Sequence, residues 1–292
     1  MRGLEASPSP EGEGRVGVRG QVVEPSQLLA ARARAHALRM VHRAKASHIG
    51  AALSMIDILA VLYADALTVL PSEPEWPYRD RLIVSKGHGA VGLYAVLGEM
   101  GFFPIDELKT YGQDGARLMG HVSHKVPGVE LSTGSLGHGL PVACGLALGL
   151  PKARTYCLLG DGELNEGSNW EAIMFAAHHR LGNLTAIVDH NKIQSLGRVE
   201  EVLDMGSIAT KFDAFGWRVV EIDGHDHQAL RLSFDEVSSP LGEGREGVRR
   251  PTCIVAHTVK GKGVDFMEDE LAWHYKSPND TQLENALRQV EA

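Results

Sequence analysis

Cysteine is scarce in this sequence of 292 residues, which contains only Cys144, Cys157 and Cys253. The three cysteines lie far apart, each inside an apolar stretch. Their spacing matches neither a zinc site nor a disulfide framework, so these two ways of stabilising a fold are not expected here. We expect three buried free thiols in a chain that is long enough to fold around its own hydrophobic core.

An excess of basic charge is also missing, because 29 lysines and arginines face 37 aspartates and glutamates and the net charge is -8. Proteins that bind the phosphate backbone of nucleic acids usually carry a basic stripe, so we expect no nucleic-acid partner. Residues 1–25 are rich in Gly, Pro, Ser and Glu and have no apolar run of signal-peptide length. Charge, Gly or Pro interrupts each later apolar window before the ~20 residues that a membrane span requires. We therefore expect a flexible tail on a cytoplasmic protein that does not span a membrane.

Apolar segments typical of buried strands alternate along the chain with segments typical of helices. Strands are expected at 81–86, 155–160, 184–190, 217–223 and 252–258. Helices are expected at 26–45, 54–67, 140–150 and 167–181, and near 206–215 and 226–236. This alternation predicts an α/β fold with a parallel sheet and helices on both faces, formed by residues 26–292 as one domain. Residues 238–251 are expected to form a loop or a frayed connection.

Polar residues follow four of the expected strands. His88 follows the first strand, Asp161 the second, Asn191 the third and His225 the fourth. Ligands of parallel sheets bind at the carboxyl ends of the strands, so we expect one shared site at this edge.

The stretch "LLGDGELNEGSNW" (158–170) crowds acidic residues into a Gly-Asp-Gly turn. Asp161 offers a carboxylate oxygen, Asn191 an amide oxygen and Ile193 a backbone carbonyl, a set that suits Mg²⁺ or Ca²⁺ completed by phosphate oxygens and water. The glycines allow close approach of a diphosphate, and the helix that follows directs its amide groups toward the same place. These features predict a metal-bridged diphosphate site.

Five segments together resemble the transketolase family. "GDGELNEGSNWEAIMFAAHHRLGNLTAIVDHNKIQ" (160–194) is similar to the thiamine diphosphate signature of that family. The other four follow the family order and are "KASHIGAALS" (45–54), "SKGHGAVGLYAVL" (85–97), "GHVSHKVPGVELSTGSLGHGL" (120–140) and "VKGKGVDFMEDELAWH" (259–274). The resemblance covers about residues 26–280 and implies the thiamine diphosphate-binding fold of the family.

The resemblance also implies a role for each matching residue. Asp161, Asn191 and the Ile193 carbonyl would hold Mg²⁺, or Ca²⁺ or Mn²⁺ in its place. The cofactor residues would be His88 and Gly162 at the diphosphate, Gly134, Ser135 and Leu136 along the thiamine, and His274.

Three histidines and one glutamate complete the set of residues that the resemblance implies. His48, His121 and His274 would face the sugar and move protons on its hydroxyl groups, a task for which the ordinary pKa of histidine is suitable. Glu166 would hydrogen-bond across a subunit interface, although an acid at a helix start is also favoured by the helix dipole.

The chain departs from the long transketolases at Ser47 and Ile49, where those proteins carry Gly and Pro. Transketolases of the usual length continue with a pyrimidine-binding domain, whose glutamate activates the cofactor, and then with a third domain. The resemblance implies that this sequence holds only the first domain of that pattern. The resemblance therefore implies the amino-terminal subunit of a split transketolase, inactive by itself and active in a heterotetramer of two such subunits with two carboxy-terminal partner subunits. Its reaction in carbohydrate metabolism would transfer a two-carbon ketol unit from a ketose, or its phosphate, to an aldose, or its phosphate.

Two alternative functions stay open at this point. One is a subunit of another thiamine diphosphate carboligase or synthase, which uses pyruvate or serves specialised metabolism, and the other is a non-catalytic thiamine diphosphate-binding homologue. Among single residues, Glu163 has no assigned role. His138 stands where many full-length transketolases carry Gln, a position that could contact the diphosphate. His225 matches a family pattern, and a turn or cap role and a cofactor contact both stay open for it. Lys260 and Lys262 are expected to be solvated, and His36, His42, His178 and His179 to serve the surface or packing.

Overall fold

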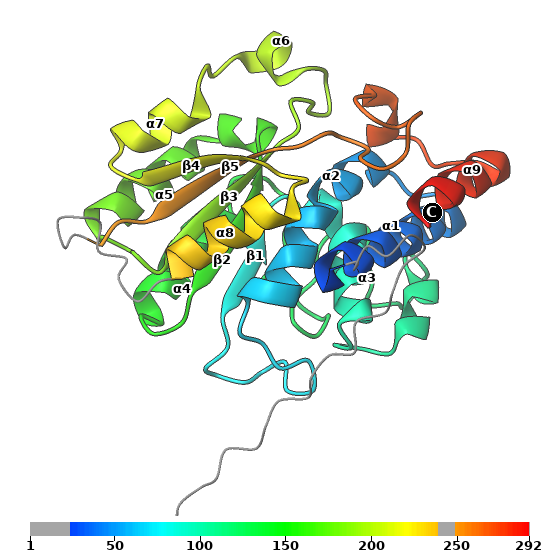
Figure 1. Ribbon diagram of the computed structural model, residues 1–292, viewed down its shortest axis with the longest axis horizontal. Helices are drawn as coiled ribbons and strands as arrows, with labels where there is room; N and C mark the ends of the chain where they lie inside the picture. The colour runs from blue at the N-terminus through cyan, green and yellow to red at the C-terminus, as the bar shows by residue number, and fades with distance from the viewer. Residues whose placement is uncertain (1–23, 239–248, 292) are drawn as a thin grey trace, which may run out of the picture.

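The computed structural model describes residues 24–238 and 249–291, and at its centre lies a parallel sheet (Figure 1). Its strands are β1 (Arg81–Val84), β2 (Thr155–Gly160), β3 (Leu184–His190), β4 (Arg218–Asp223) and β5 (Thr252–His257). Their order across the sheet is β1-β2-β3-β5-β4, and every neighbouring pair is parallel. The predicted α/β fold is confirmed. Strands β2 and β3 have the expected bounds, and the other three are one or two residues shorter than expected.

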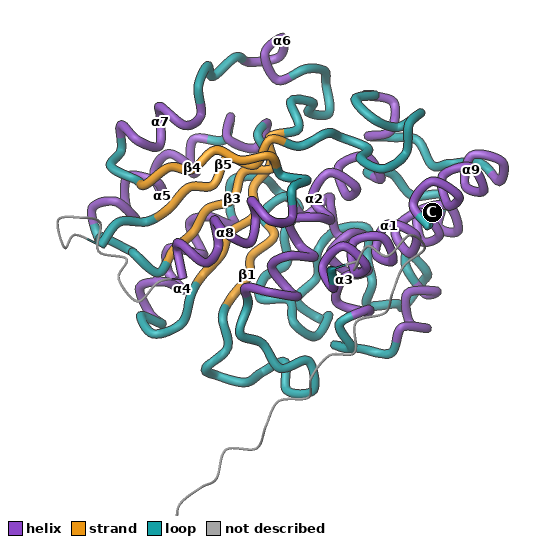
Figure 2. The backbone as a smooth tube through the Cα atoms, in the orientation of Figure 1, coloured by secondary structure: helices purple, strands orange, loops and turns teal. Residues whose placement is uncertain are grey.

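Helices surround this sheet (Figure 2). They are α1 (Pro25–Ala44), α2 (Ile49–Val61), α3 (Ala90–Glu99), α4 (Gly139–Gly149), α5 (Gly167–His178), α6 (Val199–Leu203), α7 (Ile208–Ala214), α8 (His227–Ser238) and α9 (Asp280–Val290). A π-helical turn, Leu62–Ala66, extends α2, and 3₁₀ turns occur at Gly87–Gly89, Ile105–Thr110, Gly162–Asn165 and Leu271–His274.

The two faces of the sheet carry two separate hydrophobic cores. Alternate strand residues such as Leu82 and Leu158 pack with α1, α2, α3 and α8, whereas Ile83 and Cys157 pack with α4, α5 and α7. In Figure 1, α8 accordingly lies in front of the sheet while α4 and α5 lie behind it. All three cysteines are buried and free, as predicted.

Helix α2 begins at Ile49, five residues before its predicted start at Ser54. Serine is a favoured residue at helix starts, but Ser54 here lies inside the helix, and its hydroxyl donates to the Asp189 carboxylate (2.6 Å) instead of capping the first turn. Helix α3 was missed because "AVGLYAVLGE" is apolar all round and has no amphipathic period. Helix α9 was also missed, although its capping box of Asn279 and Gln282 is visible in the sequence.

One described segment, Ile49–Ala66, has the length and mean hydropathy (1.7) of a membrane span. However, 83% of it is buried inside the protein. This segment is α2 with its π-helical turn, and its apolar side chains form part of the core rather than an outer surface.

Two predictions of irregular structure fall largely outside the described residues. They are the tail of residues 1–25, of which Pro25 already belongs to α1, and the connection of residues 238–251.

The close contact of α4 with the end of β1 provides a test of this packing. A methyl group on Gly139 would lie 2.8 Å from the Cα atom of Ser85, whereas one on Gly145 would meet no atom within 4 Å. We expect Gly139→Ala to lower the free energy of unfolding by about 1–3 kcal/mol through overpacking. Gly145→Ala in the same helix should raise it by about 0.5–1 kcal/mol through helix propensity. Urea unfolding of both variants measures the difference, and equal stabilities would contradict this packing.

Candidate active site

Four histidine rings meet at the carboxyl edge of the sheet. His48 is the N-cap of α2, His88 lies in the turn after β1, His121 lies in a loop, and His274 ends a 3₁₀ turn. The ring centroid of His48 lies 5.4 Å from that of His88, 5.7 Å from that of His121 and 4.9 Å from that of His274. The three histidines that were expected to face the sugar therefore lie in one cluster, together with His88.

Backbone hydrogen bonds between loops hold this cluster together. The His48 amide donates to the His274 carbonyl (2.8 Å). The Val122 amide donates to the Gly87 carbonyl (3.1 Å), and the Thr133 amide donates to the Val122 carbonyl (3.1 Å). Because Gly87 and Val122 are each one residue from a clustered histidine, these bonds join the backbone segments that carry His88 and His121.

Burial is the main reason why the pKa values of three clustered histidines are low. It lowers the pKa of His48 to about 4 and that of His274 to about 3, and holds the pKa of His88 well below its usual value. The positive charges of Lys86 and Lys260 act in the same direction. These imidazoles are uncharged at neutral pH, so each ring has one nitrogen that accepts and one that donates. The expectation of pKa values near the working pH is wrong for His48 and His274.

Asp161 follows β2 and is 3% exposed. Its carboxylate accepts hydrogen bonds from the Gly162 amide (2.7 Å) and the Lys192 amide (2.5 Å). Burial, followed by the negative charge of Asp189, raises the pKa of Asp161 to about 6. A cation beside the carboxylate would favour the ionised form, so this group suits a metal ligand.

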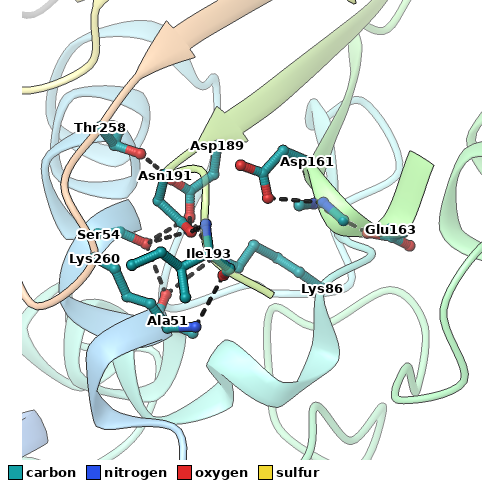
Figure 3. A network of polar contacts seen from close by, with 12 residues as sticks. Ala51, Ser54, Lys86, Asp161, Glu163, Asp189, Asn191, Ile193, Thr258 and Lys260 are labelled. Carbon is teal, nitrogen blue, oxygen red and sulfur yellow. Dashed lines mark hydrogen bonds and ion pairs between the residues drawn. The ribbon is translucent and has the colours of Figure 1, made fainter. Parts of the chain in front are cut away.

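Asn191 and Ile193 lie on the loop after β3, close to Asp161 (Figure 3). The Asn191 side chain donates to Asp189 (3.3 Å) and Ser54 (3.3 Å), and its oxygen accepts from the Ile193 amide (3.2 Å). The Ile193 carbonyl accepts from the Lys260 ammonium (2.9 Å) and retains a second lone pair.

These three oxygen donors fit a hard cation better than a zinc ion. No group of three or more His, Cys, Asp and Glu side chains in the described part of the chain could hold a metal ion. One carboxylate, one amide oxygen and one carbonyl would fill part of the coordination sphere of the metal. Phosphate oxygens and water would fill the rest, which is the usual arrangement for Mg²⁺.

A fully buried ion pair lies beside these ligands (Figure 3). Lys86 is 1% exposed and pairs with Asp189, which is 0% exposed. Lys86 also donates to the Ala51 carbonyl (3.0 Å), while Asp189 accepts from Ser54 (2.6 Å) and Thr258. Burial alone would raise the pKa of Asp189, but the charge of Lys86 and these hydrogen bonds hold it below its usual value. The pair joins α2 to the carboxyl ends of β1, β3 and β5.

Glu163, to which the sequence assigned no role, has a clear structural role. It is buried and accepts hydrogen bonds from the Ser85 hydroxyl, the Gly137 amide (3.0 Å) and the Gly160 amide (3.1 Å). One carboxylate thus connects the end of β1, the end of β2 and the loop before α4. Its spacing in the Gly-Asp-Gly turn did not reveal these partners, because two of them lie far away in the sequence.

The loop of Gly134, Ser135 and Leu136 forms part of the rim of the histidine cluster. A methyl group on Gly134 would lie 3.1 Å from Cδ2 of His121. Ser135 is exposed and Leu136 is half-buried, so both can be approached from outside.

Gly162 and Glu166 lie in and just after the turn that follows β2. A methyl group on Gly162 would lie 2.8 Å from Cβ of Gln194, so the glycine permits close packing of this turn against the loop that carries Asn191. Glu166 is the exposed N-cap residue of α5, and its side chain makes no capping hydrogen bond.

Lys260 contradicts the expectation that it is solvated. It is 1% exposed, and its ammonium contacts Nδ1 of His274 (3.0 Å) in addition to the Ile193 carbonyl. Burial lowers the pKa of Lys260 to about 8. Lys262 is half-buried and lies 3.6 Å from Glu268, so only this second lysine is partly solvated.

Seven further histidines fall into two groups. His36 and His42 make hydrogen bonds on helix surfaces, while His178 and His179 are exposed, as expected. His138 is exposed at the start of α4. His225 and His227 instead bind one buried carboxylate, that of Asp57.

The role of Glu163 can be tested by stability measurements. Glu163→Gln keeps the shape of the side chain but places an amide NH₂ where three donors converge, so we expect a loss of about 1–3 kcal/mol in the free energy of unfolding. The matched control is Glu171→Gln on the exposed side of α5, which should change it by less than about 0.5 kcal/mol. If both variants unfold at the same urea concentration, Glu163 does not hold these loops.

The chain resembles known proteins in its sequence and its fold. Residues 26–289 match the family model described as "Transketolase, thiamine diphosphate binding domain". The chain is 39% identical over 272 residues to a subunit of the apulose-4-phosphate transketolase of Phocaeicola vulgatus, covering 92% of this chain and 94% of the relative. It is 44% identical over 249 residues to the protein of the same name from Actinobacillus succinogenes, covering 84% and 87%.

Solved structures show the same similarity. The transketolase of Campylobacter jejuni superposes with a TM-score of 0.84 at 30% identity, and that of Leishmania mexicana with 0.83 at 30% identity. These matches cover 93% and 91% of this chain but only 43% and 41% of the two solved chains. The chain belongs to the transketolase family and corresponds to its thiamine diphosphate binding domain.

Proposed function

We propose that this chain is the amino-terminal subunit of a two-component transketolase. The enzyme would transfer a two-carbon ketol unit from a ketose, or its phosphate, to an aldose, or its phosphate. The observation that carries the proposal is the packing of His48, His121 and His274 at the same sheet edge as Asp161 and Asn191. This arrangement lets one site hold a metal-bound diphosphate and handle a hydroxyl-rich substrate.

The oxygen donors of this site would hold the cofactor and a divalent metal ion. Asp161, Asn191 and the Ile193 carbonyl would bind Mg²⁺, or Ca²⁺ or Mn²⁺, and His88 and Gly162 would lie at the diphosphate. One carboxylate leaves the metal with net positive charge to attract the diphosphate. When bound, thiamine diphosphate supplies the nucleophilic carbon and the electron sink that carbon-carbon cleavage requires.

The histidine cluster would bind the sugar. His48 and His274 are uncharged at neutral pH because of burial, so each ring has a nitrogen lone pair that can accept a hydrogen bond from a sugar hydroxyl. His121 is exposed at the open side of the cluster, where a substrate can reach it. Gly134, Ser135 and Leu136 would line the thiamine on the same rim.

A partner subunit would supply the activating glutamate and the rest of the active site. The apulose-4-phosphate relatives are themselves named as subunits of a transketolase, and the matches cover 94% and 87% of their length, which supports an enzyme of two components. We propose a heterotetramer of two plus two subunits in the cytoplasm, with the exposed side chain of Glu166 at a subunit interface. The buried free thiols are consistent with a reducing compartment.

Reconstitution with the carboxy-terminal subunit tests the proposed reaction. The two subunits, mixed with thiamine diphosphate and Mg²⁺, should convert a ketose phosphate such as xylulose 5-phosphate and an aldose phosphate acceptor into a new ketose phosphate. Each of the two chains should be inactive without the other. Product formation from pyruvate in place of the ketose would instead indicate another carboligase, and cofactor binding without any turnover would indicate a non-catalytic homologue.

Metal dependence gives a second prediction. In the assembled complex, Asp161→Asn and His88→Ala should each weaken binding of thiamine diphosphate, measured by calorimetric titration with Mg²⁺, by about 10- to 100-fold or more. EDTA should have the same effect on the wild-type complex. The control Asp213→Asn removes a carboxylate from the exposed side of α7 and should not change the affinity. Unchanged affinity in Asp161→Asn would refute the assigned metal site.

A further inference from the structure

Asp57 forms a buried cluster in the second half of α2. Its carboxylate accepts two hydrogen bonds from the Arg34 guanidinium (3.0 and 2.5 Å), one from His225 (2.7 Å) and one from His227 (3.0 Å). Asp57 is only 5% exposed, and these four hydrogen bonds replace the water that its buried carboxylate has lost. Neither the metal site nor the sugar site uses any of these residues.

His225 connects this cluster to the loop that follows β5. Its Nε2 atom accepts a hydrogen bond from the Val259 amide (2.8 Å). An imidazole nitrogen that accepts carries no proton, so the proton lies on Nδ1 and is donated to Asp57. Asp57 therefore fixes both the ring orientation and the tautomer that the Val259 contact needs.

Arg34 connects the same cluster to the other end of this loop. Its two terminal nitrogens bind Asp57, and its Nε atom donates to the Lys262 carbonyl (3.2 Å). Gly263 follows with a φ of 93°, and a methyl group there would lie 3.2 Å from the Arg34 side chain. The loop is thus held at Val259 and at Lys262 by groups that share one carboxylate.

Lys260 lies between these two anchored residues. Its ammonium donates to the Ile193 carbonyl (2.9 Å) and contacts Nδ1 of His274 (3.0 Å). The next residue, Gly261, donates its amide to the Gly50 carbonyl (2.9 Å) near the start of α2. A shift of the loop would therefore move a cation that contacts both a proposed metal ligand and a proposed sugar-binding histidine.

We propose that Asp57, Arg34 and His225 form a positioning cluster that fixes the loop Val259–Lys262 and thereby sets the Lys260 ammonium against Ile193 and His274. The catalytic part of this inference rests on the proposed function, whereas the loop contacts do not. The three residues act through Lys260 and do not themselves touch the cofactor or the sugar. His227 is a natural comparison, because it binds the same carboxylate but connects it to Ser26 on α1 (2.9 Å) instead of to the loop.

Hydrogen exchange and amine labelling of the chain test the positioning cluster without any activity assay. His225→Ala should raise the exchange rate of the segment 258–264 about tenfold or more and make Lys260 reactive toward acetic anhydride. His227→Ala, the matched control, removes an equivalent bond to Asp57 and should leave this segment protected. His225→Gln, which offers both an acceptor for Val259 and a donor for Asp57, should restore protection and remains informative if His225→Ala does not fold.

Kinetics of the complex with the partner subunit test the catalytic consequence. We expect His225→Ala to lower kcat by about 10- to 100-fold, because small displacements of positioned groups have effects of this size. His225→Gln should recover most of that loss, and His227→Ala should change kcat by less than about twofold.

Two results would overturn the proposal. The first is equal exchange in segment 258–264 for His225→Ala and His227→Ala at matched overall stability. The second is an unchanged kcat in a His225 variant whose loop is released. If the wild-type complex transfers no ketol unit, the proposed function fails, while the exchange and labelling results still decide whether the cluster fixes the loop.

Discussion

The buried ion pair of Lys86 and Asp189 is the interaction on which the rest of the site depends. Removing two charges from water is costly, and such a pair is tolerated only when further hydrogen bonds satisfy both groups. Ser54, Thr258 and the Ala51 carbonyl provide them here. Because these partners come from α2 and from the end of β5, while the pair itself joins the ends of β1 and β3, satisfying the pair requires all these elements to meet at one point. The histidine cluster and the oxygen donors lie directly beside this point.

The electrostatic character of the site follows from the same arrangement. The chain carries a net charge of -8, yet two lysines, Lys86 and Lys260, are almost fully buried at the sheet edge. Their charges help to keep the neighbouring imidazoles of His48 and His274 neutral. The sheet edge therefore combines buried ammonium groups with neutral imidazoles. This combination suits a ligand with an anionic diphosphate at one end and a sugar at the other.

The sequence allowed the strands and the residues at their carboxyl ends to be predicted, because buried strands are continuous apolar runs and ligands of parallel sheets lie at that edge. It could not reveal the partners of buried charges. Lys86 and Asp189 are 103 positions apart, and Asp57 is 168 positions from His225, so only the folded chain brings them together. For the same reason Glu163 had no assigned role, and Lys260 was expected to be solvated. The histidine pKa values were misjudged because burial, which lowers them, cannot be read from spacing.

The central claim is that the Lys86–Asp189 pair organises a thiamine diphosphate site. The most direct test is a calorimetric titration of thiamine diphosphate with Mg²⁺ into the assembled complex that carries Lys86→Gln and Asp189→Asn together. This double variant removes both buried charges while keeping hydrogen-bonding groups, so the chain should still fold. The account predicts that its affinity is about 10- to 100-fold weaker than that of the wild-type complex. Wild-type affinity in a folded double variant would contradict it.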